Sequence, residues 1–149
     1  MKTLCGANYD ECGFKEKCKG CAETKGSPFG GECIAAEYIK AGGMEHFLAF
    51  KKQLIEEFNG LGIDGMPEIT ELYELCGIHV NLEYPLPSGE KVKLLKDTDV
   101  YLGIQVECLH AKGSKNGRCY GLVAGMDFLL VSEYGENGTE PDVVVFKRR

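Results

Sequence analysis

The sequence contains no apolar run of the roughly 18–20 residues that a membrane-spanning helix requires, so no transmembrane segment is predicted. Its first residues, MKTLCGANYDECGFKEKC, also lack an apolar stretch of signal-peptide length. We therefore expect a cytoplasmic protein that is not attached to a membrane. Hydrophobic residues make up 44% of the 149 positions, an ordinary fraction for a globular protein, which argues against wholesale disorder.

The chain also lacks an excess of positive charge. Its net charge is −6, and residues 45–149 carry all of it, because residues 1–44 contain six lysines and six acidic residues. Proteins that bind nucleic acids usually present a basic face that neutralises phosphates. A nucleic-acid partner is therefore disfavoured, and a protein or a small molecule is the expected partner.

Familiar catalytic motifs are missing as well. The sequence has no Walker-type phosphate loop, no G-x-G-x-x-G after a predicted strand, no H-E-x-x-H and no G-x-S-x-G. A zinc deaminase would need His-x-Glu followed by Pro-Cys-x-x-Cys, and neither half is present. No catalytic residue is predicted from these patterns.

What the chain has in abundance is cysteine near its start. Five of its eight cysteines fall within the first 33 residues: Cys5, Cys12, Cys18, Cys21 and Cys33. In a reducing compartment, such a cluster indicates metal binding rather than a disulfide framework. This segment has almost no periodic apolar pattern from which to build a core, and a bound metal supplies the missing folding energy in small zinc modules.

The most specific part of this cluster is Cys18-Lys19-Gly20-Cys21. Two intervening residues let both thiolates reach one tetrahedral centre, and the glycine relieves the tight turn between them. Lys17 and Lys19 offset the negative charge of a site with four thiolates. Zinc prefers such ligands and takes four of them in a structural site. We therefore predict a structural tetrathiolate zinc site near the N-terminus.

Five candidate ligands for four positions leave one over. Cys18 and Cys21 rank first, and Cys33 and Cys12 follow, because Cys33 comes after Gly30-Gly31-Glu32 at a predicted helix start that favours a thiolate. Cys5 ranks last by a narrow margin. The alternative function is a redox or metal-dependent enzyme that uses this cluster, with the surplus cysteine as a reactive thiol. An iron–sulfur cluster is the alternative cofactor, although the spacing matches neither common ferredoxin pattern.

A fainter group of cysteines and histidines lies further along the chain, as Cys76-x2-His79, Cys108-x-His110 and Cys119. Cys108 and Cys119 flank a predicted loop, so they could face each other across a hairpin and form a second metal or redox site. Cysteine is among the residues most often buried, and we interpret these three as core residues. His46 falls on a polar helix face and is not predicted to be a ligand.

Helices are predicted over Cys33–Lys40 and Met44–Leu61, separated by Gly42-Gly43 and ended by Asn59-Gly60. The second helix carries an apolar stripe at three- and four-residue spacings, which indicates packing on a sheet: Met44, Phe47, Leu48, Leu54, Ile55, Phe58 and Leu61.

Residues 69–147 alternate between apolar and polar in the manner of strands, most clearly over Val100–Cys108. The other predicted strands are Ile78–Tyr84, Lys91–Leu95, Arg118–Ala124, Asp127–Tyr134 and Asp142–Phe146. Short turns between successive strands are typical of an antiparallel meander. The predicted class is therefore α+β, with a Cys-rich metal module at residues 1–42 and a helix plus sheet at 43–149, packed as one unit.

The segment CGANYDECGFKEKCKGCAETKGSPFGGECIAAEYIKAGG resembles a widespread prokaryotic Cys-rich family of unknown function, whose members are often labelled as zinc-binding. The matching elements are Cys5-Gly6, Cys12, the Cys18–Cys21 motif and Cys33 before a helix. The later segments VNLEYPLP and YLG are similar to a longer variant of that family. The resemblance implies zinc binding but no established reaction. Members of the family often carry a further cysteine where this chain has Tyr9, and sometimes one near Ser27.

Overall fold

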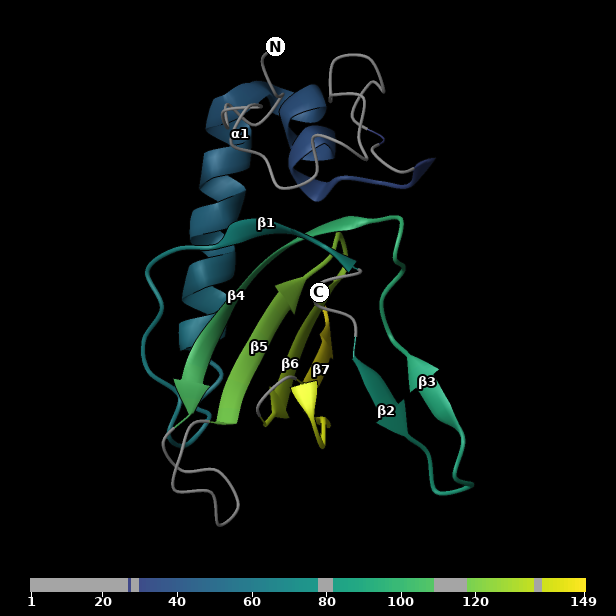
Figure 1. The fold of residues 1–149 in the computed structure, drawn as a ribbon. Coiled ribbons are helices and arrows are strands. Elements are labelled where there is room, and N and C mark those ends of the chain that lie inside the picture. Colours follow the sequence, from purple (N-terminus) through teal and green to yellow (C-terminus); the bar gives the residue numbers. More distant parts are fainter. Residues whose placement is uncertain (1–26, 28–29, 78–81, 109–117, 136–137) are drawn as a thin grey trace.

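The computed structural model describes residues 27, 30–77, 82–108, 118–135 and 138–149. In these residues one helix precedes seven strands: α1 (Ile34–Asn59), β1 (Tyr73–Cys76), β2 (Glu83–Pro85), β3 (Lys91–Lys93), β4 (Val100–Cys108), β5 (Arg118–Ala124), β6 (Phe128–Tyr134) and β7 (Asp142–Arg148). Figure 1 shows α1 behind the larger sheet, with the β2–β3 hairpin to one side. A helix followed by antiparallel strands confirms the predicted α+β class.

The two predicted helices are confirmed as two helical segments that meet at a kink within α1. α1 runs over Ile34–Asn59, and only Gly43 within it has non-helical backbone angles, with φ 81° and ψ −177°. A positive φ is strained for residues that carry a Cβ, so glycine is the residue suited to this break. Gly43 therefore separates two helical segments, in agreement with the predicted break at Gly42-Gly43.

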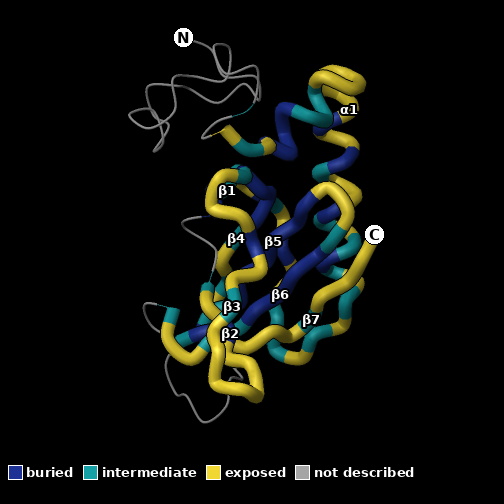
Figure 2. Tube along the Cα trace, turned by 90° about the vertical axis from the view of Figure 1, so that its right-hand side faces the viewer, coloured by how far each residue is buried: buried dark blue, intermediate teal, exposed yellow. Residues whose placement is uncertain are grey.

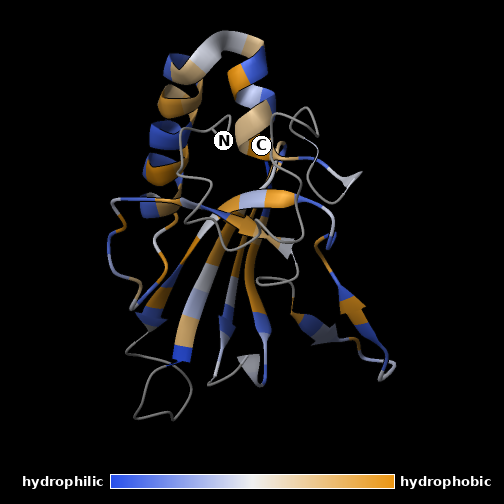
Figure 3. Cartoon of the chain, turned by 45° about the horizontal axis from the view of Figure 1, so that its top comes forward, coloured by the Kyte–Doolittle hydropathy of each residue, from blue (hydrophilic) through white to orange (hydrophobic). Residues whose placement is uncertain are grey.

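The buried face of α1 differs in part from the predicted stripe. Phe47, Leu54 and Phe58 are buried as expected, together with Phe50, whereas Leu48 is 52% exposed. Leu48 follows Phe47 by one residue, which turns it about 100° away from the buried face. Figure 3 shows the resulting alternation of hydrophobic and hydrophilic residues around α1. No helix in the described ranges is long and apolar enough to span a membrane.

The larger sheet has the order β1-β4-β5-β6-β7, and every neighbouring pair is antiparallel. Strands β4 to β7 form the predicted meander. β1 is a strand that the sequence pattern did not single out, and it pairs with β4 through Cys76 and Val100 at one end. The chain between β1 and β4 leaves the sheet and returns to it.

The predicted meander was wrong in including the segments around Tyr84 and Lys91. β2 and β3 form a separate two-stranded sheet, with Tyr84 opposite Val92. Proline has no amide hydrogen for a strand ladder, so Pro85 and Pro87 suit a short peripheral hairpin better than a central strand. Of the predicted strand Ile78–Tyr84, residues 78–81 lie outside the described part.

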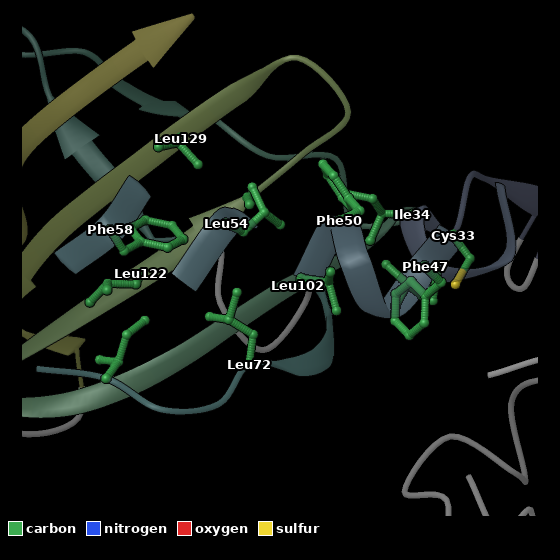
Figure 4. Packing of buried hydrophobic residues seen from close by; sticks show 14 of the residues in the cluster. Cys33, Ile34, Phe47, Phe50, Leu54, Phe58, Leu72, Leu102, Leu122 and Leu129 are labelled. Atoms are coloured by element: carbon green, nitrogen blue, oxygen red, sulfur yellow. The ribbon is translucent and has the colours of Figure 1, made fainter. Parts of the chain in front are cut away.

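The sheet is buried on both faces, although unequally. Val100 and Leu102 of β4 face α1, and they belong to a buried cluster with Phe47, Leu54 and Phe58. Figure 4 shows the labelled helix side chains gathered beside Leu102, Leu122 and Leu129 of the strands. The opposite face carries a smaller cluster made by Leu95, Tyr101, Val123 and Leu130. Figure 2 shows the buried central strands with an exposed hairpin and an exposed β7 at the periphery.

Candidate functional site

Only one of the five predicted metal ligands lies among the residues that the structure describes. Cys5, Cys12, Cys18 and Cys21 lie outside them, and Cys33 lies inside. Within the described part of the chain, no group of three or more histidine, cysteine, aspartate or glutamate residues is arranged to hold a metal ion. The tetrathiolate site therefore stays a prediction, and the surroundings of Cys33 are the part of it that can be examined.

Cys33 is the residue that precedes α1. Its backbone is extended, with φ −117° and ψ 117°, and its carbonyl accepts the amide hydrogen of Glu37 at 3.0 Å, which begins the helical bonding. Cys33 also forms a parallel β-bridge with Val100, the first residue of β4. The residue is only 7% exposed. The helix start that the sequence predicted at Cys33 is thus confirmed, and the sheet holds it in place.

The two residues before Cys33, Gly31 and Glu32, lie against the segment that leads into β4. The amide of Val100 donates to the carbonyl of Glu32 at 2.7 Å, and the amide of Glu32 donates to Oδ1 of Asp99 at 3.1 Å. A Cβ atom on Gly31 would lie 2.2 Å from the carbonyl oxygen of Thr98, so only glycine fits there. The backbone on the N-terminal side of Cys33 is therefore preorganised by contacts far away in sequence.

The same connection, Lys96–Val100, also holds the end of β1; we call it the 96–100 loop. The amide of Gly77 donates to the carbonyl of Asp99 at 3.0 Å, and the thiol of Cys76 donates to the carbonyl of Asp97 at 3.3 Å. A Cβ atom on Gly77 would lie 2.1 Å from the carbonyl oxygen of Lys96. Two glycines, Gly31 and Gly77, thus lie close against the backbone of the 96–100 loop. Val100 at the end of this loop pairs with both Cys33 and Cys76.

A small cavity of about 220 Å³ adjoins this junction. Its polar lining comes from Glu32, Lys96, Asp99 and Asp127, and Tyr101 of β4 lines it as well. Pockets for small-molecule ligands usually enclose about 300–1,000 Å³. This cavity is smaller than that range, so we assign no ligand to it.

Tyr101 fixes the 96–100 loop from the side of the sheet opposite α1. Its hydroxyl accepts the amide hydrogen of Lys96 at 3.0 Å and lies 3.4 Å from Oδ2 of Asp99, to which it donates. Burial raises the pKa of Tyr101 to about 12, because the ionised form would lose its hydration, and the carboxylate of Asp99 adds to the rise. Burial likewise raises the pKa of Tyr134 to about 12, with further contributions from Cys119 and Tyr84.

These two tyrosines predict a loss of stability at alkaline pH. Their folded-state pKa of about 12 lies above the ordinary value of 10.0, so the stability that they contribute should be fully present below pH 10 and should be lost between pH 10 and 12. The chain has seven tyrosines and no tryptophan, so the near-ultraviolet tyrosinate band reports their ionisation directly. Tyr101→Phe should remove one late-titrating tyrosine. If all tyrosines of the folded chain titrate together near the ordinary value, the described burial of Tyr101 and Tyr134 is wrong.

The second predicted group of cysteines is not assembled by the described residues. Cys119 pairs with Glu107 and Cys108 pairs with Arg118, so the two cysteines are not opposite each other across the hairpin. Cys76 is fully buried at the end of β1, which confirms its interpretation as a core residue. His46 is exposed and stacks on Tyr38, with ring centroids 5.3 Å apart. His79 and His110 lie outside the described residues.

Sequence reasoning missed the 96–100 loop altogether. Its residue types, Lys-Asp-Thr-Asp-Val, are those of an ordinary polar turn before a strand. The glycines at positions 31 and 77 were the available signal, because each stands where another backbone approaches closely.

Comparison of the chain with protein-family models, curated proteins and solved structures yields no match in any of the three.

Proposed function

We propose that this chain is a zinc-binding protein in which four of the five N-terminal cysteines form a structural tetrathiolate site, and that its role is to bind a protein or a small molecule. The candidate ligands are Cys5, Cys12, Cys18, Cys21 and Cys33. The observation that carries the proposal is the position of Cys33, which is buried immediately before α1 and paired there with Val100 of the sheet. The other four cysteines enter the proposal from their spacing alone.

The chemistry of Cys33 suits a zinc ligand. A thiolate, not a thiol, binds the metal, and the amide groups at a helix N-terminus favour the negative charge. Glu32 is held by hydrogen bonds with Asp99 and Val100, so the backbone beside this thiolate does not need to be ordered when metal binds. A ligand that is already ordered lowers the entropy cost of assembling the site. In the proposed arrangement, the metal would fasten the Cys-rich segment to the junction of α1 and β4.

A structural role for the metal follows from the donor set. Catalytic zinc sites keep a position open and usually include histidine or carboxylate ligands, whereas four thiolates close the coordination sphere. A binding role fits such a closed site, and the acidic balance of residues 45–149 favours a partner that is not a polyanion. A reducing compartment such as the cytoplasm would keep the thiols available to the metal.

Metal analysis of substituted chains tests this proposal. The purified wild-type protein should contain about one equivalent of zinc, which plasma mass spectrometry measures. Cys33→Ala should lower the zinc content and the melting temperature together, because the site loses a ligand and the segment loses its attachment. Cys119→Ala is the matched control, since Cys119 is half-buried in β5 and should leave the zinc content unchanged.

The outcomes separate the possibilities clearly. Full zinc content in Cys33→Ala would remove Cys33 from the ligand set. A wild-type protein that holds no metal, or whose melting curve is unchanged after a chelator has removed the zinc, would contradict the structural site. Iron with visible absorbance in anaerobically purified protein would favour the iron–sulfur alternative instead.

A further inference from the structure

The backbone on both sides of Cys33 is fixed by three hydrogen bonds. The carbonyl of Cys33 accepts the amide hydrogen of Glu37 at 3.0 Å, and the carbonyl of Glu32 accepts that of Val100 at 2.7 Å. The amide of Glu32 donates to Oδ1 of Asp99 at 3.1 Å. Because peptide units are planar, holding the unit before and the unit after Cys33 sets the direction in which its side chain leaves the backbone.

Of these three contacts, only that of Asp99 comes from a side chain. The other two are made by backbone groups, which a change of side chain leaves in place. The hydroxyl of Tyr101 donates to Oδ2 of Asp99 at 3.4 Å, and that of Thr98 donates to Oδ1 at 3.3 Å. Hydrogen bonds to an ionised acceptor are stronger than those between neutral groups. The carboxylate of Asp99 is therefore a fixed point that orients Glu32.

The backbone of Asp99 binds a second segment that carries a cysteine. Its carbonyl accepts the amide hydrogen of Gly77 at 3.0 Å, and Gly77 directly follows Cys76 at the end of β1. A Cβ atom on Gly77 would collide with the carbonyl oxygen of Lys96, so β1 ends tightly packed against this loop. Asp99 thus joins the segment before α1 to the end of β1, through its side chain on one side and its backbone on the other.

We propose that Asp99 is the positioning residue of the metal site: its carboxylate orients Cys33 through the amide of Glu32, so that zinc binding and the attachment of β1 to the 96–100 loop stabilise each other. This inference rests on the proposed zinc site, in which Cys33 is a ligand. A ligand that is already held in one direction loses less conformational entropy when metal binds. Coupling between two sites is reciprocal, so a metal that is favoured by this arrangement also stabilises it.

The zinc affinity of substituted chains, measured by competition with a coloured chelator, tests this inference. Asp99→Ala should lower the affinity by about tenfold, the low end of the effect of removing a group that orients a metal ligand. Asp99→Asn should stay close to the wild type, because its amide oxygen can still accept the hydrogen of Glu32. Asp97→Ala is the matched control, since it removes the same charge from the same loop but Asp97 pairs with Lys93.

A double-mutant cycle separates positioning from a general effect on folding. The Cys33→Ala chain keeps four candidate thiols, so a weaker zinc affinity can be measured in it. If Asp99 acts through Cys33, adding Asp99→Ala to this chain should lower the affinity by no more than about twofold, because the oriented ligand is already missing. A residue that only stabilised the fold would lower the affinity equally in both chains.

Hydrogen exchange of the wild-type chain supplies a second measurement that needs no substitution. With zinc bound, the amides of Glu32 and Gly77 should exchange more slowly than in the zinc-free chain, because both are bound by Asp99. The amide of Leu86, which donates to Glu90 in the turn between β2 and β3, should exchange at the same rate in both.

Three results would overturn this role of Asp99. The first is a zinc affinity that depends on Cys33 but is unchanged in Asp99→Ala; the zinc site would then stand without the positioning role. The second is an equal loss of affinity from Asp99→Ala with and without Cys33. The third, decisive if Asp99→Ala does not fold, is equal exchange of the Glu32 and Gly77 amides with and without zinc. A wild-type chain that binds no zinc would overturn the site itself and this role with it.

Discussion

Replacing Phe58 by alanine is expected to lower the free energy of unfolding by about 3–5 kcal/mol, the range for removing a buried aromatic side chain from a core. Phe58 has no exposed surface and belongs to the buried cluster between α1 and the sheet, as do Leu54, Leu122 and Leu129. Its removal takes away apolar burial and also leaves a cavity in a region that is rigid on both sides. Urea denaturation followed by circular dichroism measures the loss.

Leu48→Ala on the same helix is the matched control. Leu48 is 52% exposed, so its truncation should change the free energy of unfolding by no more than about 0.5 kcal/mol. Both residues lie in the longer part of α1, beyond the kink at Gly43. Equal losses from the two substitutions would show that α1 does not pack on the sheet through the face described.

Glu133→Gln is expected to lower the free energy of unfolding by about 3 kcal/mol, because it leaves the guanidinium of Arg118 buried without its closest counter-charge. Nε of Arg118 lies 2.9 Å from Oε1 of Glu133, and both side chains are largely buried. The guanidinium also donates to the carbonyls of Glu133 and Glu140, at 3.2 Å and 2.7 Å. These two hydrogen bonds survive the substitution, so the loss should fall at the low end of the usual range for a broken buried pair.

Two comparisons identify the cause of that loss. Glu140 lies 3.7 Å from Arg118 but its side chain is 89% exposed, so Glu140→Gln should cost less than about 1 kcal/mol. Replacing Arg118 and Glu133 together by methionine removes both buried charges and should recover much of the stability. If Glu133→Gln unfolds at the same urea concentration as the wild type, the pair does not hold β5 to β6 as described.

The sequence pattern predicted the elements whose contacts are local or periodic. Val100 and Leu102 alternate with residues of the opposite face, and this period of two identified β4 with its correct bounds. Cys33 marked the start of α1, and Asn59-Gly60 marked its end. β1 was missed because a strand of four residues is too short for a periodic signal, and it joins the sheet only through pairing with β4.

The metal ligands remain a prediction from the sequence, and the described residues test only the position of Cys33. The spacing of the cysteines and the position of Cys33 before a helix indicate a metal site from the sequence alone. The 96–100 loop was not predictable, because the contact between Glu32 and Asp99 joins residues 67 positions apart. No local pattern carries that information, although the glycines at positions 31 and 77 are explained once the contacts are known.

The sequence by itself determined that helical segments precede antiparallel strands, since side-chain periodicity is a local property, and the spacing of its N-terminal cysteines predicts a zinc site. Only the tertiary structure decided that β2 and β3 leave the sheet and that Cys33 and Cys76 flank Val100. Those features depend on which backbone groups meet across long sequence separations, and that choice is made by the packing of the whole chain.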